Sequence, residues 1–139
     1  MTRVGSRLLP HTADLFVEAR AGDFASLCSI SVEALFSVLT DRRRIRRAQK
    51  RILEFPVAPP EELLLSVLRR SLLLFSLERF LVRHADVVMT AKKMVVSLEG
   101  EPMDAARHSI GRELKAVTAH AVAVESGISG IAARFVLDV

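Results

Sequence analysis

The stretch PPEELLLSVLRRSLLLF, residues 59–75, does most to decide the fold. Pro60 favours a helix start, because proline lacks only a backbone donor that has no partner in the first helical turn. Glu61 and Glu62 then place negative charge at the positive end of the helix dipole. The segment predicts a helix from about Glu61 to Leu77 that is apolar around most of its circumference. Such a helix has to be covered by a sheet or by a partner.

Another helix is predicted upstream of this stretch. Asp23 follows Gly22 and can accept hydrogen bonds as an N-cap, and the helix would end near Thr40 and Asp41. Its apolar positions recur at spacings of three and four, which is the period of a helix with one buried face. These positions are Phe24, Leu27, Cys28, Ala34, Leu35, Val38 and Leu39.

The remaining segments read as strands. A short strand is predicted at 15–19, and an imperfectly alternating one at 51–57 is followed by Pro59 and Pro60. Two more are predicted at 81–88 and 93–98. Segments 113–124 and 131–139 form a hairpin around Ser126–Gly130. Two helices and several mostly antiparallel strands predict an α+β fold, a two-layer single domain spanning residues 1–139 with a mixed, mostly antiparallel sheet.

Composition limits the number of domains, the cysteine chemistry and the cellular location that we expect. The chain has 139 residues, which suits one domain, and its one cysteine, Cys28, excludes an intramolecular disulfide and a Cys-rich zinc site. Leu8 and Leu9 are followed at once by Pro10, so the first residues lack the apolar core of a signal peptide. The apolar run 63–77 is shorter than the roughly 20 residues that span a bilayer. We therefore expect a cytoplasmic protein.

The formal net charge of +4 comes largely from one block between residues 42 and 51. This block contains Arg42, Arg43, Arg44, Arg46, Arg47, Lys50 and Arg51. One interpretation is a solvated turn and strand edge, where clustered charge discourages edge pairing. The other is a surface that faces RNA or a partner protein. The block has no interleaved aromatic residues for base stacking, which weakens the case for a dedicated single-strand RNA module.

Four motifs, taken together, resemble the archease family. They are LPHTADLFVEA at 9–19, GEPMDAARH at 100–108, ELKAVTAHAVAV at 113–124 and ARFVLDV at 133–139. Their order and spacing match the family from end to end, with the two predicted helices lying between the first and the second. Each motif alone would be weak evidence, whereas the set is specific.

The resemblance implies an accessory protein of an RtcB-type RNA ligase, rather than an enzyme. That ligase joins RNA ends in tRNA splicing through a guanylylated histidine, using GTP and a divalent metal. The archease promotes guanylylation and repeated turnover. The resemblance also implies a metal site at Asp14 and Asp138, and a required lysine at Lys115.

The chemistry of these residues agrees in part with the resemblance. Carboxylates from Asp14, Asp138 and the end of the chain at Val139 would form a hard oxygen site, suited to Ca²⁺ first and to Mg²⁺ or Mn²⁺ as alternatives. A hairpin that reverses near Ile128 places Asp138 across from about Thr118, although a slip of one residue would change which side chains share its face.

Other interpretations stay open for each site residue. Asp14 could cap a turn, Asp138 could be solvated, and Lys115 could pair with Glu113. His11, His108 and His120 match no standard zinc spacing, which favours structural roles. Residues Glu101, Asp104, Arg107 and His108 form a polar loop that is typical of a binding surface, yet Asp104 could equally cap a local turn.

The chain departs from the family pattern in its second predicted helix. Ser66, Val67, Arg69 and Arg70 stand where the family usually has Asp-Trp and Asn-Glu, and Ala119 replaces a usual tyrosine. These changes put partner contact through that helix in doubt. Two rival functions remain: a chaperone-like or RNA-binding module that uses the basic block, and a small metal-dependent hydrolase. The sequence offers no nucleophile motif or glycine-rich phosphate loop for the hydrolase.

Overall fold

The computed structural model describes residues 3–8 and 14–139, with side chains described for 14–119 and 122–139. The chain forms seven strands, two α-helices and one 3-10 turn among these residues. In chain order they are β1 (Arg3–Leu8), β2 (Asp14–Ala21), α1 (Phe24–Leu39), η1 (Arg42–Arg44), β3 (Gln49–Pro56), α2 (Pro60–Glu78), β4 (Phe80–Met89), β5 (Lys93–Pro102), β6 (Ala116–Gly127) and β7 (Gly130–Asp138).

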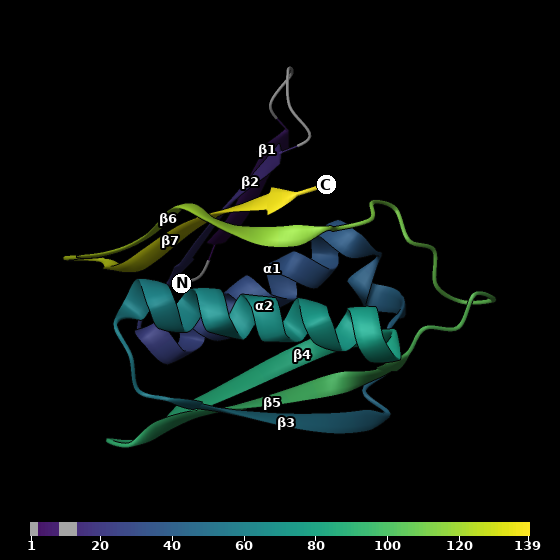
Figure 1. Cartoon of the computed structure of the whole chain (residues 1–139), viewed down its shortest axis with the longest axis horizontal. Helices are drawn as coiled ribbons and strands as arrows, with labels where there is room; N and C mark the ends of the chain where they lie inside the picture. The colour runs from purple at the N-terminus through teal and green to yellow at the C-terminus, as the bar shows by residue number, and fades with distance from the viewer. Residues whose placement is uncertain (1–2, 9–13) are drawn as a thin grey trace.

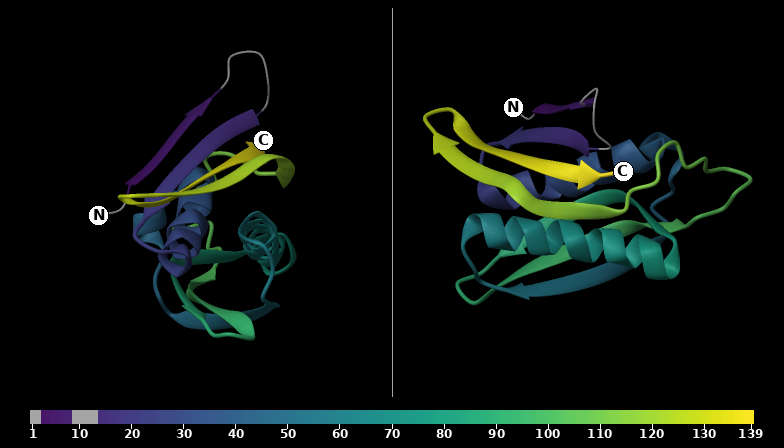
Figure 2. Two further views of the ribbon diagram at one scale, coloured as in Figure 1. Left: turned by 90° about the vertical axis from the view of Figure 1, so that its left-hand side faces the viewer. Right: turned by 45° about the horizontal axis from the view of Figure 1, so that its top comes forward.

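The strands form two antiparallel sheets. One has four strands in the order β1-β2-β7-β6, and the other has three in the order β3-β5-β4. Figure 1 shows the helices lying between the two sheets, and the side view in Figure 2 shows α1 and α2 next to each other in that middle layer. Helix α1 contacts both β2 and β4, and α2 contacts both β6 and β4.

The predicted α+β class, with two helices and antiparallel strands, is confirmed, but the arrangement of layers differs from the prediction. Two sheets enclose the helices, so there are three layers instead of two, and no described strand pair is parallel. The physical reason lies in the helices, because the buried residues of each extend around about half of its circumference. In α2 the buried residues are Leu63, Leu64, Val67, Leu68, Ser71, Leu72 and Phe75.

Local sequence explains where the helices begin and end. Asp23 caps α1 as predicted, since its Oδ1 accepts a hydrogen bond from the backbone N–H of Ser26 at 2.7 Å. Pro60 opens α2, and Arg79 ends it in the left-handed conformation with φ of 54°. None of the described helices is long and apolar enough to cross a membrane.

Side chains from α1 and η1 cap the free edge of β4. The carbonyls of Arg83 and Ala85 accept hydrogen bonds from Arg42 and from Ser29 Oγ, respectively, while the N–H of Ala85 donates to Glu33 Oε2 at 3.1 Å. An edge strand whose backbone groups are occupied in this way is a poor template for further pairing. The first arginine of the basic block therefore has a structural role.

The free edge of β6 is capped in a similar way by α2. Arg69 Nε donates to the carbonyl of Val117 at 3.0 Å, and Glu61 Oε2 accepts from the N–H of Val124 at 3.3 Å. Arg69 is one of the departures from the family pattern in this helix. Its observed contact ties α2 to the four-stranded sheet.

Candidate functional site

Asp14 and Asp138 lie directly opposite each other on neighbouring strands. They are register partners at the end of the β2–β7 pair, which joins the first and last parts of the described chain. The next residues, Leu15 and Leu137, are buried, so the two aspartates belong to the opposite face of the sheet, away from the helices. Both aspartates are half-buried.

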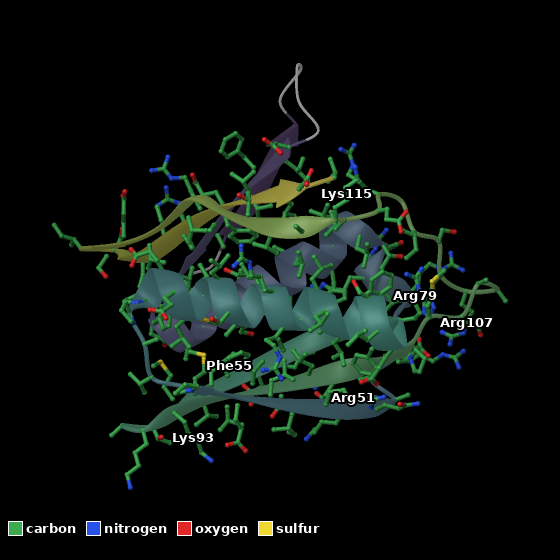
Figure 3. All side chains as sticks on the ribbon, viewed as in Figure 1. Arg51, Phe55, Arg79, Lys93, Arg107 and Lys115 are labelled. Atoms are coloured by element: carbon green, nitrogen blue, oxygen red, sulfur yellow. The ribbon has the colours of Figure 1, made fainter. Side chains whose placement is uncertain are left out.

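Lys115 joins this pair through the backbone. Its N–H donates to the carbonyl of Asp138 at 2.8 Å, and the next residue, Ala116, is the register partner of Asp138. The Lys115 side chain is exposed, and Figure 3 shows it at the end of the four-stranded sheet. Asp14, Asp138 and Lys115, which are far apart in the sequence, therefore meet at one end of that sheet.

The predicted pairing of Asp138 with about Thr118 is wrong by two residues. At the turn, Gly127 pairs with Gly130, but further along four residues of β6, 119 to 122, lie opposite the single residue Phe135. This bulge brings Ala116 opposite Asp138 instead. Strand β6 also begins at Ala116, later than the predicted start at Glu113.

Four further residues were predicted for this site, and they divide into two pairs. His11 lies outside the described residues, and so does the side chain of His120. Glu113 is exposed and forms no ion pair with Lys115, while Val139 is half-buried beside Asp138. Within the described part of the chain, no three His, Cys, Asp or Glu side chains are grouped closely enough to hold a metal ion.

The donor chemistry of the aspartate pair fits a hard cation. Residues opposite each other in an antiparallel pair have Cβ atoms about 4.5–5.5 Å apart, close enough for two carboxylates to share one ion. Without a counter-charge, like charges at that separation repel each other. Carboxylate oxygens are the ligands that Ca²⁺ and Mg²⁺ prefer, and the two aspartates need a third donor to complete a site.

A second polar cluster surrounds Glu101, which is only 6% exposed. Its carboxylate accepts hydrogen bonds from Arg107 Nη1 and Nη2 at 2.8 and 2.6 Å and from the backbone N–H of Arg46 at 2.8 Å. His108 Nε2 lies 3.0 Å from its Oε2. The Arg107 guanidinium is the main cause that lowers the pKa of Glu101 to about 2. Sequence reasoning singled out this loop but did not identify Glu101 as its centre.

The contacts of His108 fix its tautomer. Its Nδ1 accepts the backbone N–H of Asp104 at 2.9 Å, so the ring proton resides on Nε2 and points to Glu101. Asp104 Oδ1 in turn accepts from the N–H of Ala106 at 3.0 Å, which is a local turn cap. In this arrangement His108 and Asp104 organise the loop, and the ring nitrogens of His108 are already engaged.

Most of the basic block forms local ion pairs. Arg42 pairs with Glu33, Arg43 with Asp41, Arg47 with Glu99, and Arg51 with Glu78. Arg44, Arg46 and Lys50 are exposed and form no ion pair among the described residues. Arg42 is half-buried and donates to the backbone of the β4 edge, so it is not part of the solvated turn that the sequence predicts. The prediction that the block binds a partner applies to Arg44, Arg46 and Lys50.

Fold and site together define a class of protein: an α+β protein with two helices between two antiparallel sheets and a pair of opposed carboxylates at one end of the larger sheet. The solution structure of Methanobacterium thermoautotrophicum protein 1598 has this fold, with a TM-score of 0.81, 22% sequence identity, and 98% of each chain covered. No curated protein matches the sequence. The model of the archease protein family (MTH1598/TM1083) matches residues 7–139. The chain therefore belongs to the archease family.

Proposed function

We propose that the protein is a non-enzymatic accessory factor of an RtcB-type RNA ligase, which promotes guanylylation of the ligase and its multiple turnover. The proposal is supported by membership of the archease family, a family of accessory proteins in RNA processing. In this proposal the chain binds a divalent cation, with Ca²⁺ favoured over Mg²⁺ or Mn²⁺. Its partners are the ligase and, through the ligase, tRNA or other RNA. A cytoplasmic location is part of the proposal.

The observation that carries the proposal is the pairing of Asp14 with Asp138 beside Lys115. The two carboxylates would hold the cation, and Val139 or a histidine, His11 or His120, would supply a further donor. A bound cation would offset the repulsion between the carboxylates and attract phosphate oxygens. Lys115 adds a second positive charge at the same end of the sheet.

The position of the site suits contact with a large partner. The aspartates belong to the face of the four-stranded sheet that the helices leave uncovered, and they lie at the end of that sheet. A ligase could therefore approach the cation and Lys115 without any rearrangement of the core. The chain's own role would be to hold the cation and the ammonium group in position, while the reacting groups belong to the ligase.

Multiple-turnover RNA joining by the cognate ligase with GTP and a divalent metal tests the proposal. We expect wild-type protein to increase the number of joined ends per ligase, and Asp138→Ala to abolish the increase while circular dichroism shows an intact fold. Lys115→Gln should also impair activation. Lys92→Gln removes an equal charge from an exposed turn and serves as the matched control. Wild-type protein that leaves turnover unchanged would refute the accessory role.

A further inference from the structure

Three arginines stack on three buried phenylalanines where α2 faces β3. The guanidinium carbon lies 4.5 Å from the ring centroid for Arg51 over Phe80, 5.6 Å for Arg70 over Phe55, and 4.3 Å for Arg79 over Phe75. All three rings are at most 5% exposed. We call Arg51, Arg70 and Arg79 the arginine seam. It places cations over core aromatic side chains.

Two members of the arginine seam are available to a ligand. Arg70 and Arg79 are exposed, and among the described residues neither forms an ion pair. Among the described residues, the side chain of Arg79 donates one hydrogen bond, to the Sδ atom of Met103 at 3.6 Å, which is a weak acceptor. Each of these two guanidinium groups lies over a phenylalanine ring on one side, and the exposure of both residues leaves N–H groups accessible to solvent.

The surroundings of the arginine seam are basic, because the nearby carboxylates are already used. Glu78 pairs with Arg51 at 3.1 Å, Glu99 with Arg47 at 2.5 Å, and Glu101 with Arg107 at 2.6 Å. Further unpaired cations lie beside these acids. Arg46 is exposed and donates only its backbone N–H to Glu101, and Lys50 is the register partner of Glu99.

Backbone contacts bring Arg46, Lys50 and Arg79 to one end of the molecule. The carbonyl of Arg79 accepts the N–H of Met103 at 2.7 Å, two residues after Glu101, whose side chain accepts the N–H of Arg46. Figure 3 shows Arg79, Arg107 and Arg51 around the end of α2, with Lys93 at the opposite end of the molecule. Arg70 lies nine residues before Arg79, about 13 Å along the helix.

We propose that Arg46, Lys50, Arg70 and Arg79 form a binding surface for single-stranded RNA. Unpaired bases stack on the open faces of Arg70 and Arg79, and Arg46 and Lys50 contact phosphates. Bases stack on guanidinium planes much as on aromatic rings, and phosphates pair with unpaired cations. The choice of RNA over DNA rests on the proposed function. The inference adds a direct RNA contact that the carboxylate site does not supply.

An acidic protein surface is the rival occupant. Leu73 and Leu77 on α2 are 48% and 75% exposed, and apolar residues beside arginines also suit a protein interface. The observations favour RNA because the cations that form no ion pair with a described residue outnumber the exposed leucines. Planar, pre-positioned guanidinium groups further suit flat ligands.

Fluorescence anisotropy with labelled oligouridylate of about 12 nucleotides tests the proposal on the full chain without any ligase. We expect binding that weakens with salt. The side chain of Arg46 forms no hydrogen bond or ion pair with the described residues, so replacing it should leave the fold intact. In Arg46→Gln the slope of log K against log salt should fall by about 0.7. The double variant Arg70→Gln/Arg79→Gln should weaken binding at least about fivefold. Lys92→Gln/Lys93→Gln removes the same charge at the other end and should bind as wild type does.

A charge-preserving variant separates stacking from charge. Arg70→Lys/Arg79→Lys keeps both positive charges but loses the planes, so its affinity should fall while its salt slope stays at the wild-type value. The proposal is overturned if wild-type protein does not bind the RNA at low salt, or if the control variant weakens binding as much as the seam variant. Seam-dependent binding of polyglutamate without RNA binding would assign the surface to a protein. None of these outcomes depends on ligase activation, so the two proposals can fail separately.

Discussion

At the residue scale, Glu101 shows how one buried carboxylate organises a loop. It joins the segment after η1, through Arg46, to the loop after β5, through Arg107 and His108. The loop is also held to the end of α1, where Thr40 Oγ1 donates to the carbonyl of Ser109 at 2.6 Å. These contacts set the path of the chain toward Lys115.

Replacing Glu101 with glutamine should destabilise the fold. The amide keeps the shape but loses the charge that Arg107 and His108 face, and hydrogen bonds to charged groups contribute about 1.5–3 kcal/mol each. We expect a loss of about 2–3 kcal/mol in the free energy of unfolding, measured by urea titration. The exposed pair of Glu54 with Lys93 provides the control, since Glu54→Gln should change stability by less than about 1 kcal/mol.

The same carboxylate predicts a dependence on pH. Because the pKa of Glu101 falls from 4.5 to about 2 on folding, its stabilisation is fully present above 4.5 and is lost as pH falls toward 2. The difference in unfolding free energy between wild type and Glu101→Gln should therefore shrink between about pH 6 and about pH 2.5. Other carboxylates with lowered pKa values, such as Asp23 and Glu99, are present in both proteins, so their contributions cancel in the difference between the two unfolding free energies. A constant difference across this range would contradict the assignment.

At the element scale, both helices and six of the seven described strands follow the sequence pattern closely. Alternation and helical spacing predict where elements lie, but they do not specify which strands pair, so the division into two sheets was not foreseen. The sequence pattern does not predict strand β1. It also predicts a different partner for Asp138, because the bulge at 119–122 leaves no clear trace in the sequence. The aspartates themselves were predicted from the motifs, and only pairing through space brings them together.

A glycine in β5 offers a test at this scale. A Cβ atom added to Gly100 would overlap the carbonyl of Leu81 in β4, so that Gly100→Ala must displace backbone. We expect a loss of stability of at least about 2–3 kcal/mol in thermal or urea unfolding. At Gly111 a Cβ atom meets nothing within 4 Å, and Gly111→Ala should lie within about 1 kcal/mol of wild type. Equal effects at the two positions would rule out the close approach of β4 and β5.

At the scale of the whole molecule, the three layers separate structural and exposed surfaces. The helices fill the space between the sheets, and their side chains cap the free edges of β4 and β6. Burial in the middle layer raises the pKa of the Cys28 thiol to about 12, so this cysteine is unreactive at neutral pH. The outer face that carries the aspartates remains open.

Calcium should stabilise the whole molecule through the aspartate pair. A ligand that binds the folded state alone adds about 2.7 kcal/mol when its concentration is one hundred times its dissociation constant. We expect Ca²⁺ to raise the melting temperature of wild-type protein and to leave that of Asp138→Asn unchanged. Glu113→Gln removes a nearby exposed carboxylate and should keep the wild-type response. A calcium response that persists in Asp138→Asn would place the ion elsewhere.

The strand order also governs when the protein can finish folding. Strand β7 follows every other described element in the sequence, yet it lies inside the four-stranded sheet between β2 and β6. During synthesis the other sheet and both helices can assemble from neighbouring segments, because β3, β4 and β5 are all available early. The larger sheet must wait until β7, which follows β2 and β6 in the sequence, has been synthesised. Until then β2 and β6 stay unjoined, and a stalled chain would expose apolar surfaces of both helices to the cell's quality control.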